Sequence, residues 1–334
     1  MLSETAGRSG ETAARDVELA TSLMGNWVNE PVSRLDDHHS FAANDGSPVE
    51  FSFAMNRSEV EPRVCFESLD RSSGAPHGLT QHHFVRQLDD VLAVDVSRLR
   101  LVEDLFAPGP AGGLFSMLCA TAFRADGDPL FKVYLNPATA GEPRQAVGEA
   151  MARLGLGAQW AFLEKQLGAG RSPHQEIAFF ALDLGASPEA RVKLYLRHTG
   201  CGPAEFERAA GLAEDYQPDL FTKILGRLYG DAAAGLRKAP MTCLAFQGNR
   251  PQPTSATLYC PLDPNLADDA EANARIVDLL EMSGIASDRF DTVSTAISGS
   301  HPAGAHRLSW LGYKQPSDPI VTVYAALDGS GQPS

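Results

Sequence analysis

The feature that most constrains the fold of this chain of 334 residues is a strand-like segment that occurs four times. Each copy alternates apolar side chains with polar or aromatic ones and carries a tyrosine at the equivalent place. The copies read FKVYL at 131–135, VKLYL at 192–196, ATLYC at 256–260 and VTVYA at 321–325. Their tyrosines recur at nearly equal intervals of about 60 to 65 residues, which indicates one supersecondary unit per repeat.

Each repeated segment is predicted to be the second strand of a β-hairpin, because another strand-like run precedes it across a turn rich in Gly, Pro, Asp or Asn. The preceding strands are expected at Leu114–Phe123, Glu176–Leu184, Met241–Phe246 and Arg307–Tyr313, and the last turn at 314–319. An earlier pair, Val49–Met55 and Arg63–Ser68, supplies a fifth hairpin. Ten strands are therefore expected.

Segments with helical period separate the hairpins. They include Thr80–Val94, Pro143–Leu154, Gly157–Leu167, Pro203–Ala213, Asp219–Tyr229 and Ala267–Met282. The resulting order, ααββ repeated five times, predicts an α+β fold in which a ten-stranded antiparallel β-barrel is surrounded by helices. We expect a single domain over residues 1–334, with about residues 1–12 and 328–334 disordered.

Alternation assigns the side chains of the repeated strands to two faces. One face is apolar and is expected to pack against helices: Phe131, Val133, Leu135, Val192, Leu194, Leu196, Val321 and Val323. The other is polar and aromatic: Lys132, Tyr134, Arg191, Lys193, Tyr195, Arg197, Thr257, Tyr259, Thr322 and Tyr324. The second face could meet bulk water on an open sheet. One phenol per repeat instead favours a closed lumen, which in a ten-stranded barrel is wide enough for a ligand.

The composition limits the kinds of partner that the chain can bind and indicates the cellular compartment in which it acts. The net charge of -14 argues against a nucleic-acid partner, which requires a basic face. The five cysteines form no CxxC pair and are odd in number, which argues against a zinc site or a disulfide framework. Neither a signal peptide nor a membrane-spanning run is recognisable. We therefore expect a cytoplasmic protein, a monomer or homodimer, that acts on small molecules and not at a membrane.

Several motifs on these strands resemble those of a known enzyme family. They are GSPVEFS at 46–52, RVCFE at 63–67, the Lys-x-Tyr of Lys132 and Tyr134, the Arg-x-Lys-x-Tyr of Arg191 to Tyr195, and the tyrosines Tyr259 and Tyr324. Over nearly the whole chain this pattern resembles the ABBA or PT-barrel aromatic prenyltransferases. It is most similar to their indole-directed branch, the dimethylallyltryptophan synthase type, and in length to its bacterial members.

The resemblance implies a metal-independent transfer of a prenyl group, dimethylallyl or longer, from its diphosphate to an indole. It implies that Glu50 is catalytic and lies beside the indole N–H. The residues implied to bind diphosphate are Arg63, Lys132, Arg191, Lys193 and Thr257. The residues implied to shield the carbocation and contact diphosphate are Tyr134, Tyr195, Tyr259 and Tyr324. No cofactor is implied beyond the prenyl diphosphate co-substrate, and Asp89-Asp90 and Asp268-Asp269 begin no DDxxD metal motif.

Two positions depart from the family pattern. Thr257 stands where the family often has glutamine, and the third strand has no lysine to remove a ring proton, although Arg124 lies at its edge. The acceptor therefore stays open. A prenyltransferase of the same fold that acts on a phenol, a carbazole or another non-indole arene is one alternative, and a non-catalytic barrel that binds an isoprenoid is another.

Overall fold

Ten strands close into one antiparallel barrel, as predicted, in the computed structural model of this protein. The structure describes residues 9–29, 40–69, 82–107, 115–125, 127–168, 175–298, 306–314 and 318–326. The strands are β1 (Val49–Met55), β2 (Val60–Phe66), β3 (Met117–Ala122), β4 (Leu130–Leu135), β5 (Gln175–Asp183), β6 (Val192–His198), β7 (Met241–Phe246), β8 (Ser255–Pro261), β9 (Leu308–Lys314) and β10 (Ile320–Ala326). Strands that follow one another in the sequence are neighbours in the sheet.

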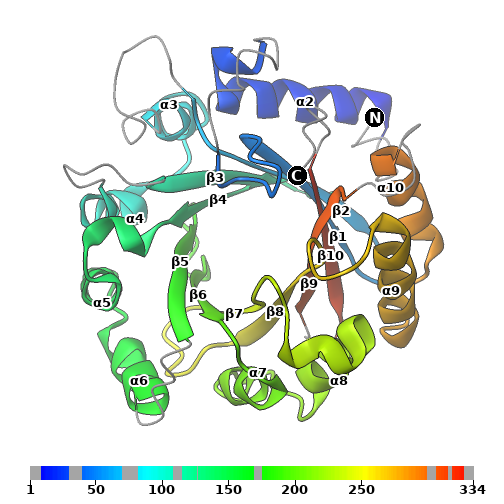
Figure 1. Ribbon diagram of the computed structural model, residues 1–334. Helices are drawn as coiled ribbons and strands as arrows, with labels where there is room; N and C mark the ends of the chain where they lie inside the picture. The colour runs from blue at the N-terminus through cyan, green and yellow to red at the C-terminus, as the bar shows by residue number, and fades with distance from the viewer. Residues whose placement is uncertain are drawn as a thin grey trace.

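The barrel is closed by the pairing of β1 with β10, in which Phe51 lies opposite Ala325 and Phe53 opposite Val323. Figure 1 shows the strands as an inner ring and the helices as an outer one. The helices are α2 (Gly10–Met24), α3 (His82–Arg86), α4 (Ser97–Arg100), α5 (Pro143–Arg153), α6 (Gly157–Gly168), α7 (Pro203–Ala210), α8 (Leu220–Tyr229), α9 (Asp269–Met282) and α10 (Asp288–Ser298). Helical segments precede each hairpin, so the expected ααββ order is present.

The hydrophobic core lies between the two rings. Every residue predicted to face the helices is buried there, from Phe131 on β4 to Val323 on β10. Aromatic contacts join the layers: Phe66 of β2 packs edge to face on Phe84 of α3, with ring centroids 5.6 Å apart. With this face of the strands covered by helices, the other face is left to line the lumen.

Several boundaries differ from the predicted ones because side chains cap or turn the backbone. Helix α9 begins at Asp269, and not at Ala267, because the Asp268 carboxylate accepts a hydrogen bond from the Glu271 amide at 3.0 Å. Helix α3 continues into a π-helical turn at Gln87–Val91, short of the predicted Val94. Helices α2, α4 and α10 were not among those predicted. Because α2 starts at Gly10, residues 10–12 are helical and not disordered as expected, while 1–8 and 327–334 lie outside the described residues.

Strands β1 and β7 match the predicted bounds at both ends, and the other strands differ from them by one to three residues. Strand β2 begins at Val60, and not at Arg63, because the Asn56 side chain accepts hydrogen bonds from the Ser58 and Glu59 amides and so forms a tight turn. Lys314, which was assigned to a turn, is the last residue of β9. Leu114 and Thr80, two predicted boundaries, lie outside the described residues. Within the part of the chain that is described, no helix has the length and apolarity to cross a membrane.

Candidate active site

The lumen holds two cavities that share a wall. The smaller has a volume of about 100 Å³ and the larger about 1110 Å³. Both are lined by the same four tyrosines and by Cys65. The two cavities are therefore two ends of one space, separated by that layer of side chains.

The smaller cavity is strongly cationic. Its charged lining residues are Arg63, Lys132, Arg191, Lys193 and Lys314, and no carboxylate of the described residues lines it. They come from β2, β4, β6 and β9, with Arg191 immediately before β6, so the cations surround the cavity. In a chain with a net charge of -14, this concentration of positive charge is local. It suits a ligand that carries several negative charges.

Two carboxylates, Asp183 buried and Glu61 partly buried, hold these cations from behind. Asp183, at the end of β5, accepts from Arg191 Nε and from Lys193 Nζ, both at 2.5 Å. Glu61 on β2 accepts from Arg63 Nε at 2.6 Å. Each arrangement fixes the position of a cation before any ligand arrives, as preorganised anion sites require.

The pKa values in this cluster follow from burial and charge. Burial alone would raise the pKa of Asp183, but Lys193 and Arg191 hold it below its usual range. For Lys132, burial and the neighbouring positive charges act in the same direction. Burial, Arg63 and Lys193 together lower its pKa well below the ordinary value. Because burial and neighbouring positive charge both disfavour the protonated lysine, an anion bound here would stabilise that form.

The dividing layer is a chain of tyrosine rings. Ring centroids lie 5.8 Å apart for Tyr134 and Tyr195, 5.4 Å for Tyr195 and Tyr259, and 6.1 Å for Tyr259 and Tyr324. They come from β4, β6, β8 and β10, the second strand of four successive hairpins. Burial raises the pKa of each hydroxyl, so all four remain neutral donors at physiological pH.

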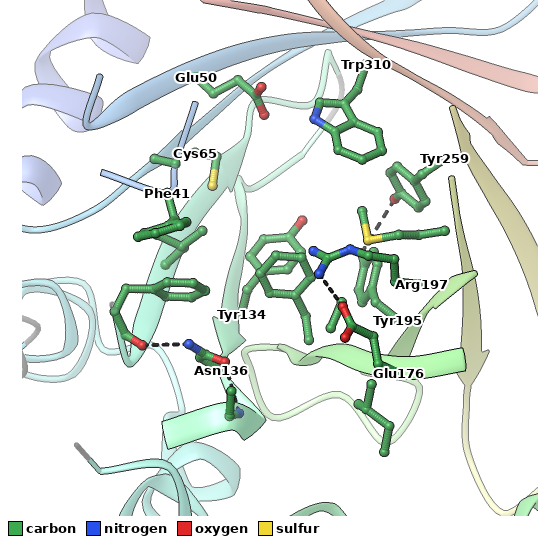
Figure 2. A pocket seen from close by; sticks show the side chains of 18 of the residues that line it. Phe41, Glu50, Cys65, Tyr134, Asn136, Glu176, Tyr195, Arg197, Tyr259 and Trp310 are labelled. Atoms are coloured by element: carbon green, nitrogen blue, oxygen red, sulfur yellow. Dashed lines mark hydrogen bonds and ion pairs between the residues drawn. The ribbon is translucent and has the colours of Figure 1, made fainter. Parts of the chain in front are cut away.

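The larger cavity is aromatic and balanced in charge. Its aromatic lining beyond the tyrosines comes from Phe41, Phe115, Phe179 and Trp310. Its acidic residues are Glu50, Glu142 and Glu176, and its basic ones are Arg144, Arg197 and Lys238. Figure 2 shows Glu50 and Trp310 on one side of this cavity, and the ion pair of Arg197 with Glu176 on the other.

Glu50 is the most perturbed acid of the larger cavity. It is 8% exposed on β1, and Ser309 Oγ donates a hydrogen bond to its Oε1 at 2.8 Å. Burial raises its pKa to about 7, although the Ser309 hydrogen bond and the charge of Lys238 lower it. A buried carboxylate with a neutral pKa beside a cavity is a candidate functional group.

Comparisons with known proteins agree with this geometry. A family described as tryptophan dimethylallyltransferase matches residues 21–228. The chain belongs to the tryptophan dimethylallyltransferase family. Its members are prenyltransferases, so this family member is an enzyme of that class, and its closed barrel with surrounding helices is the ABBA or PT-barrel fold.

Solved structures of the same fold align with almost the whole length of this chain. The 6-dimethylallyltryptophan synthase from Micromonospora olivasterospora, solved with DMASPP and Trp, is 28% identical over 98% of this chain and 94% of its own, with a TM-score of 0.89. The 5-dimethylallyltryptophan synthase from Streptomyces coelicolor is 26% identical over 99% and 96%, with a TM-score of 0.88. PriB, solved with L-tryptophan and dimethylallyl thiolodiphosphate, is 27% identical over 98% and 93%, with a TM-score of 0.85.

The structure brings all the predicted site residues of this family member into the lumen. Arg63, Lys132, Arg191, Lys193 and Thr257 line the smaller cavity, Glu50 lines the larger, and the four tyrosines line both. Arg124 does not join them: it is exposed, and its Nε donates to the carbonyl of Asp128 at 3.1 Å.

Sequence reasoning missed several charged residues of the site. Lys314 was missed because the sequence pattern assigned it to a turn and not to β9. Asp183 and Glu61 lie on strands whose alternation could have indicated a lumen position, since Asp183 is opposite Lys132 and Glu61 is two residues before Arg63. Lys238 lies in a loop before β7, and no periodicity in the sequence marks it.

Proposed function

We propose that this chain transfers a prenyl group, dimethylallyl or longer, from its diphosphate to the ring of tryptophan or of a tryptophan-derived indole. The observation that carries the proposal is one barrel lumen divided by tyrosines into a cationic cavity and an aromatic one that contains Glu50. The relatives solved with tryptophan together with DMASPP or dimethylallyl thiolodiphosphate support it.

The donor diphosphate binds in the smaller cavity. Arg63 and Arg191 offer planar forks to phosphate oxygens, Lys132 and Lys193 offer point charges, and Thr257 offers a hydroxyl. Lys314 adds a further positive charge. Because these groups are fixed before the C–O bond breaks, they stabilise the diphosphate leaving group without reorganisation.

The allylic carbocation then forms at the tyrosine layer. The faces of Tyr134, Tyr195, Tyr259 and Tyr324 stabilise it by cation–π attraction of about 0.5 to 2 kcal/mol each. The same rings separate the cation from water in the open larger cavity, and their neutral hydroxyls can donate to phosphate oxygens.

The acceptor lies in the larger cavity, where its indole N–H donates a hydrogen bond to the Glu50 carboxylate. The electron pair of the ring forms the new C–C bond to the allylic carbon. The proton of that ring carbon then passes to a base, for which the released diphosphate is available, and aromaticity is restored. Positive charge builds on the ring during the attack, and the Glu50 carboxylate stabilises it through the N–H.

The remaining predictions belong to the same proposal. No metal cofactor is required, since the cations of the smaller cavity neutralise the diphosphate. Cys65, Cys119, Cys243 and Cys260 are free thiols, which supports a reducing, cytoplasmic location. The partners are the two small-molecule substrates, with the chain itself a monomer or a homodimer.

The test is incubation with dimethylallyl diphosphate and a panel of arenes that includes L-tryptophan, simple indoles, carbazole and phenols. We expect mass spectrometry to show the gain of one prenyl unit on indole acceptors. Transfer to phenols or carbazole alone would instead support a prenyltransferase for non-indole arenes. Donor binding without transfer to any arene would contradict the proposal.

A further inference from the structure

The carboxylate of Glu50 receives its hydrogen bond from a strand that is not its neighbour in the sheet. β1 pairs with β10 and β2, whereas Ser309 lies on β9, so the 2.8 Å contact passes across β10. Ser309 is 1% exposed, and no other residue of the described chain donates a hydrogen bond to Glu50. One carboxylate oxygen is thus held while the other is left for the cavity.

A β-bulge turns Ser309 toward Glu50. Along β9 and β10, Trp310 lies opposite Tyr324 but Leu308 lies opposite Ala325, so Ser309 is an extra residue without a partner on β10. Regular alternation would direct Ser309 away from the lumen, because its neighbour Trp310 lines the larger cavity. A bulge re-aims the side chain of the extra residue, and bulges are frequent next to active sites.

The neighbouring strand leaves room for this contact. The residue of β10 directly opposite Glu50 is Ala326, whose methyl side chain is short. The bulge itself is fixed from its other side, since the Ser309 carbonyl accepts from the Leu262 amide at 2.9 Å. A larger residue at position 326 would stand between the two partners.

The titratable groups that face Glu50 come from four further places. Lys238 is held in the loop before β7 by Asn44 and by the ring of Trp310, 4.6 Å from its Nζ. Asp45 precedes β1, Cys65 lies opposite Glu50 on β2, and Tyr324 is on β10. Lys238 and Ser309 both lower the pKa of Glu50 and Asp45 raises it, while burial has the largest effect and raises it.

We propose that Ser309 is a positioning residue for the acceptor: by binding Glu50 Oε1 through the bulge, it presents Oε2 to the indole N–H and favours the ionised carboxylate. This inference rests on the proposed function, in which Glu50 accepts that N–H. Lys238 favours the same ionised form through its positive charge.

The test is the pH dependence of kcat/KM for prenyl transfer to L-tryptophan, which reports groups of the free enzyme. Activity needs ionised Glu50, so it is present above the Glu50 pKa of about 7 and is lost as the pH falls below it. Removing a donor to the ionised form raises that pKa. In Ser309→Ala we expect the acidic limb to move up by about one to two pH units, so that the rate falls by about 5- to 50-fold at pH 7 and recovers in alkaline buffer.

Three further variants keep the outcome decisive. Ser309→Thr retains the hydroxyl and should leave the limb in place. Ala326→Val changes neither partner but blocks the path between them, so it should move the limb as Ser309→Ala does. Ser283→Ala removes a buried hydroxyl that contacts Leu279 and Tyr313 outside the lumen, and should not move it.

An unmoved limb in Ser309→Ala, or an equal loss of activity at every pH, overturns the inference, because a merely structural serine would give either result. If Ser309→Ala does not fold, Ala326→Val carries the test, and an unmoved limb there overturns it. Failure of the proposed function is distinguishable, because in that case the wild-type protein transfers to no indole. If the wild type transfers and Glu50→Gln abolishes transfer while the Ser309 and Ala326 variants keep the wild-type limb, only the inference about Ser309 fails.

Discussion

The two cavities share the tyrosine layer but are built from different parts of the fold. The smaller cavity is lined almost entirely by residues of the strands, and its charged lining residues are all cations. The larger cavity is lined to a great extent by residues outside the strands, including 40–44 before β1, Asn136 and Glu142 after β4, and Lys238 before β7. Its charged residues include as many acids as bases.

This difference separates two tasks. Groups on paired strands are held by the sheet on both sides, which suits a cavity that must fix charge before a reaction. Loops can change in length and sequence without disturbing the barrel. This suits a cavity that selects among acceptors. We therefore expect changes in the two cavities to affect different steps of the reaction.

The largest effect should come from Glu50→Gln, which keeps the size of the side chain but removes its charge. Prenyl transfer to L-tryptophan should fall by about 10² to 10⁴, or roughly 3 to 5 kcal/mol. Hydrolysis of dimethylallyl diphosphate to the prenyl alcohol should persist, because the cations of the smaller cavity are on other strands. Product analysis by mass spectrometry measures both, with Glu149→Gln at an exposed ion pair on α5 as the control. Loss of both reactions together would mean that the two cavities are not independent.

Asp183→Asn tests the smaller cavity alone. It leaves the buried Lys193 and the partly buried Arg191 without their carboxylate, so the free energy of unfolding should fall by about 3 kcal/mol. Inorganic pyrophosphate should restore part of that loss by binding the unpaired cations. Chemical denaturation with and without pyrophosphate measures this. Asp278→Asn, at a partly exposed pair with Arg227, should cost at most about 1 kcal/mol. Equal losses in the two variants would contradict the interpretation.

A smaller effect is expected for Lys193→Ala, which removes one of several donors to the diphosphate. Its affinity for dimethylallyl diphosphate should weaken by about 10- to 100-fold, the value of one charge-assisted hydrogen bond, while the affinity for L-tryptophan is unchanged. Calorimetric titration of each ligand checks this, with the exposed Lys223→Ala on α8 as the control. Unchanged donor affinity would exclude Lys193 from the diphosphate site.

The same contrast explains what could be predicted from the sequence. Strand alternation and the repeated tyrosine placed Lys132, Lys193 and the tyrosine layer on the lumen side, and the number of hairpins predicted the closed barrel. Ser309 could not be predicted, since only the bulge in β9 turns it inward. Lys238 and Asn44 meet across 194 residues of sequence through loop geometry that no local pattern encodes.

The smallest expected effect is that of removing divalent metal, for which we expect no change in the rate of prenyl transfer. A metal would be needed to neutralise the diphosphate only if the protein did not supply the charge, and five cations line the smaller cavity. The carboxylates beside it are already engaged, Glu61 by Arg63 and Asp183 by Arg191 and Lys193. Within the described residues, no group of three or more His, Cys, Asp or Glu side chains could hold a metal ion.

Added magnesium would, by contrast, neutralise part of the free donor's charge and so weaken its attraction to these cations. Rates in EDTA and in magnesium, measured at saturating donor, check this, and a complete loss of transfer in EDTA that magnesium restores would show that the cationic cavity does not act alone.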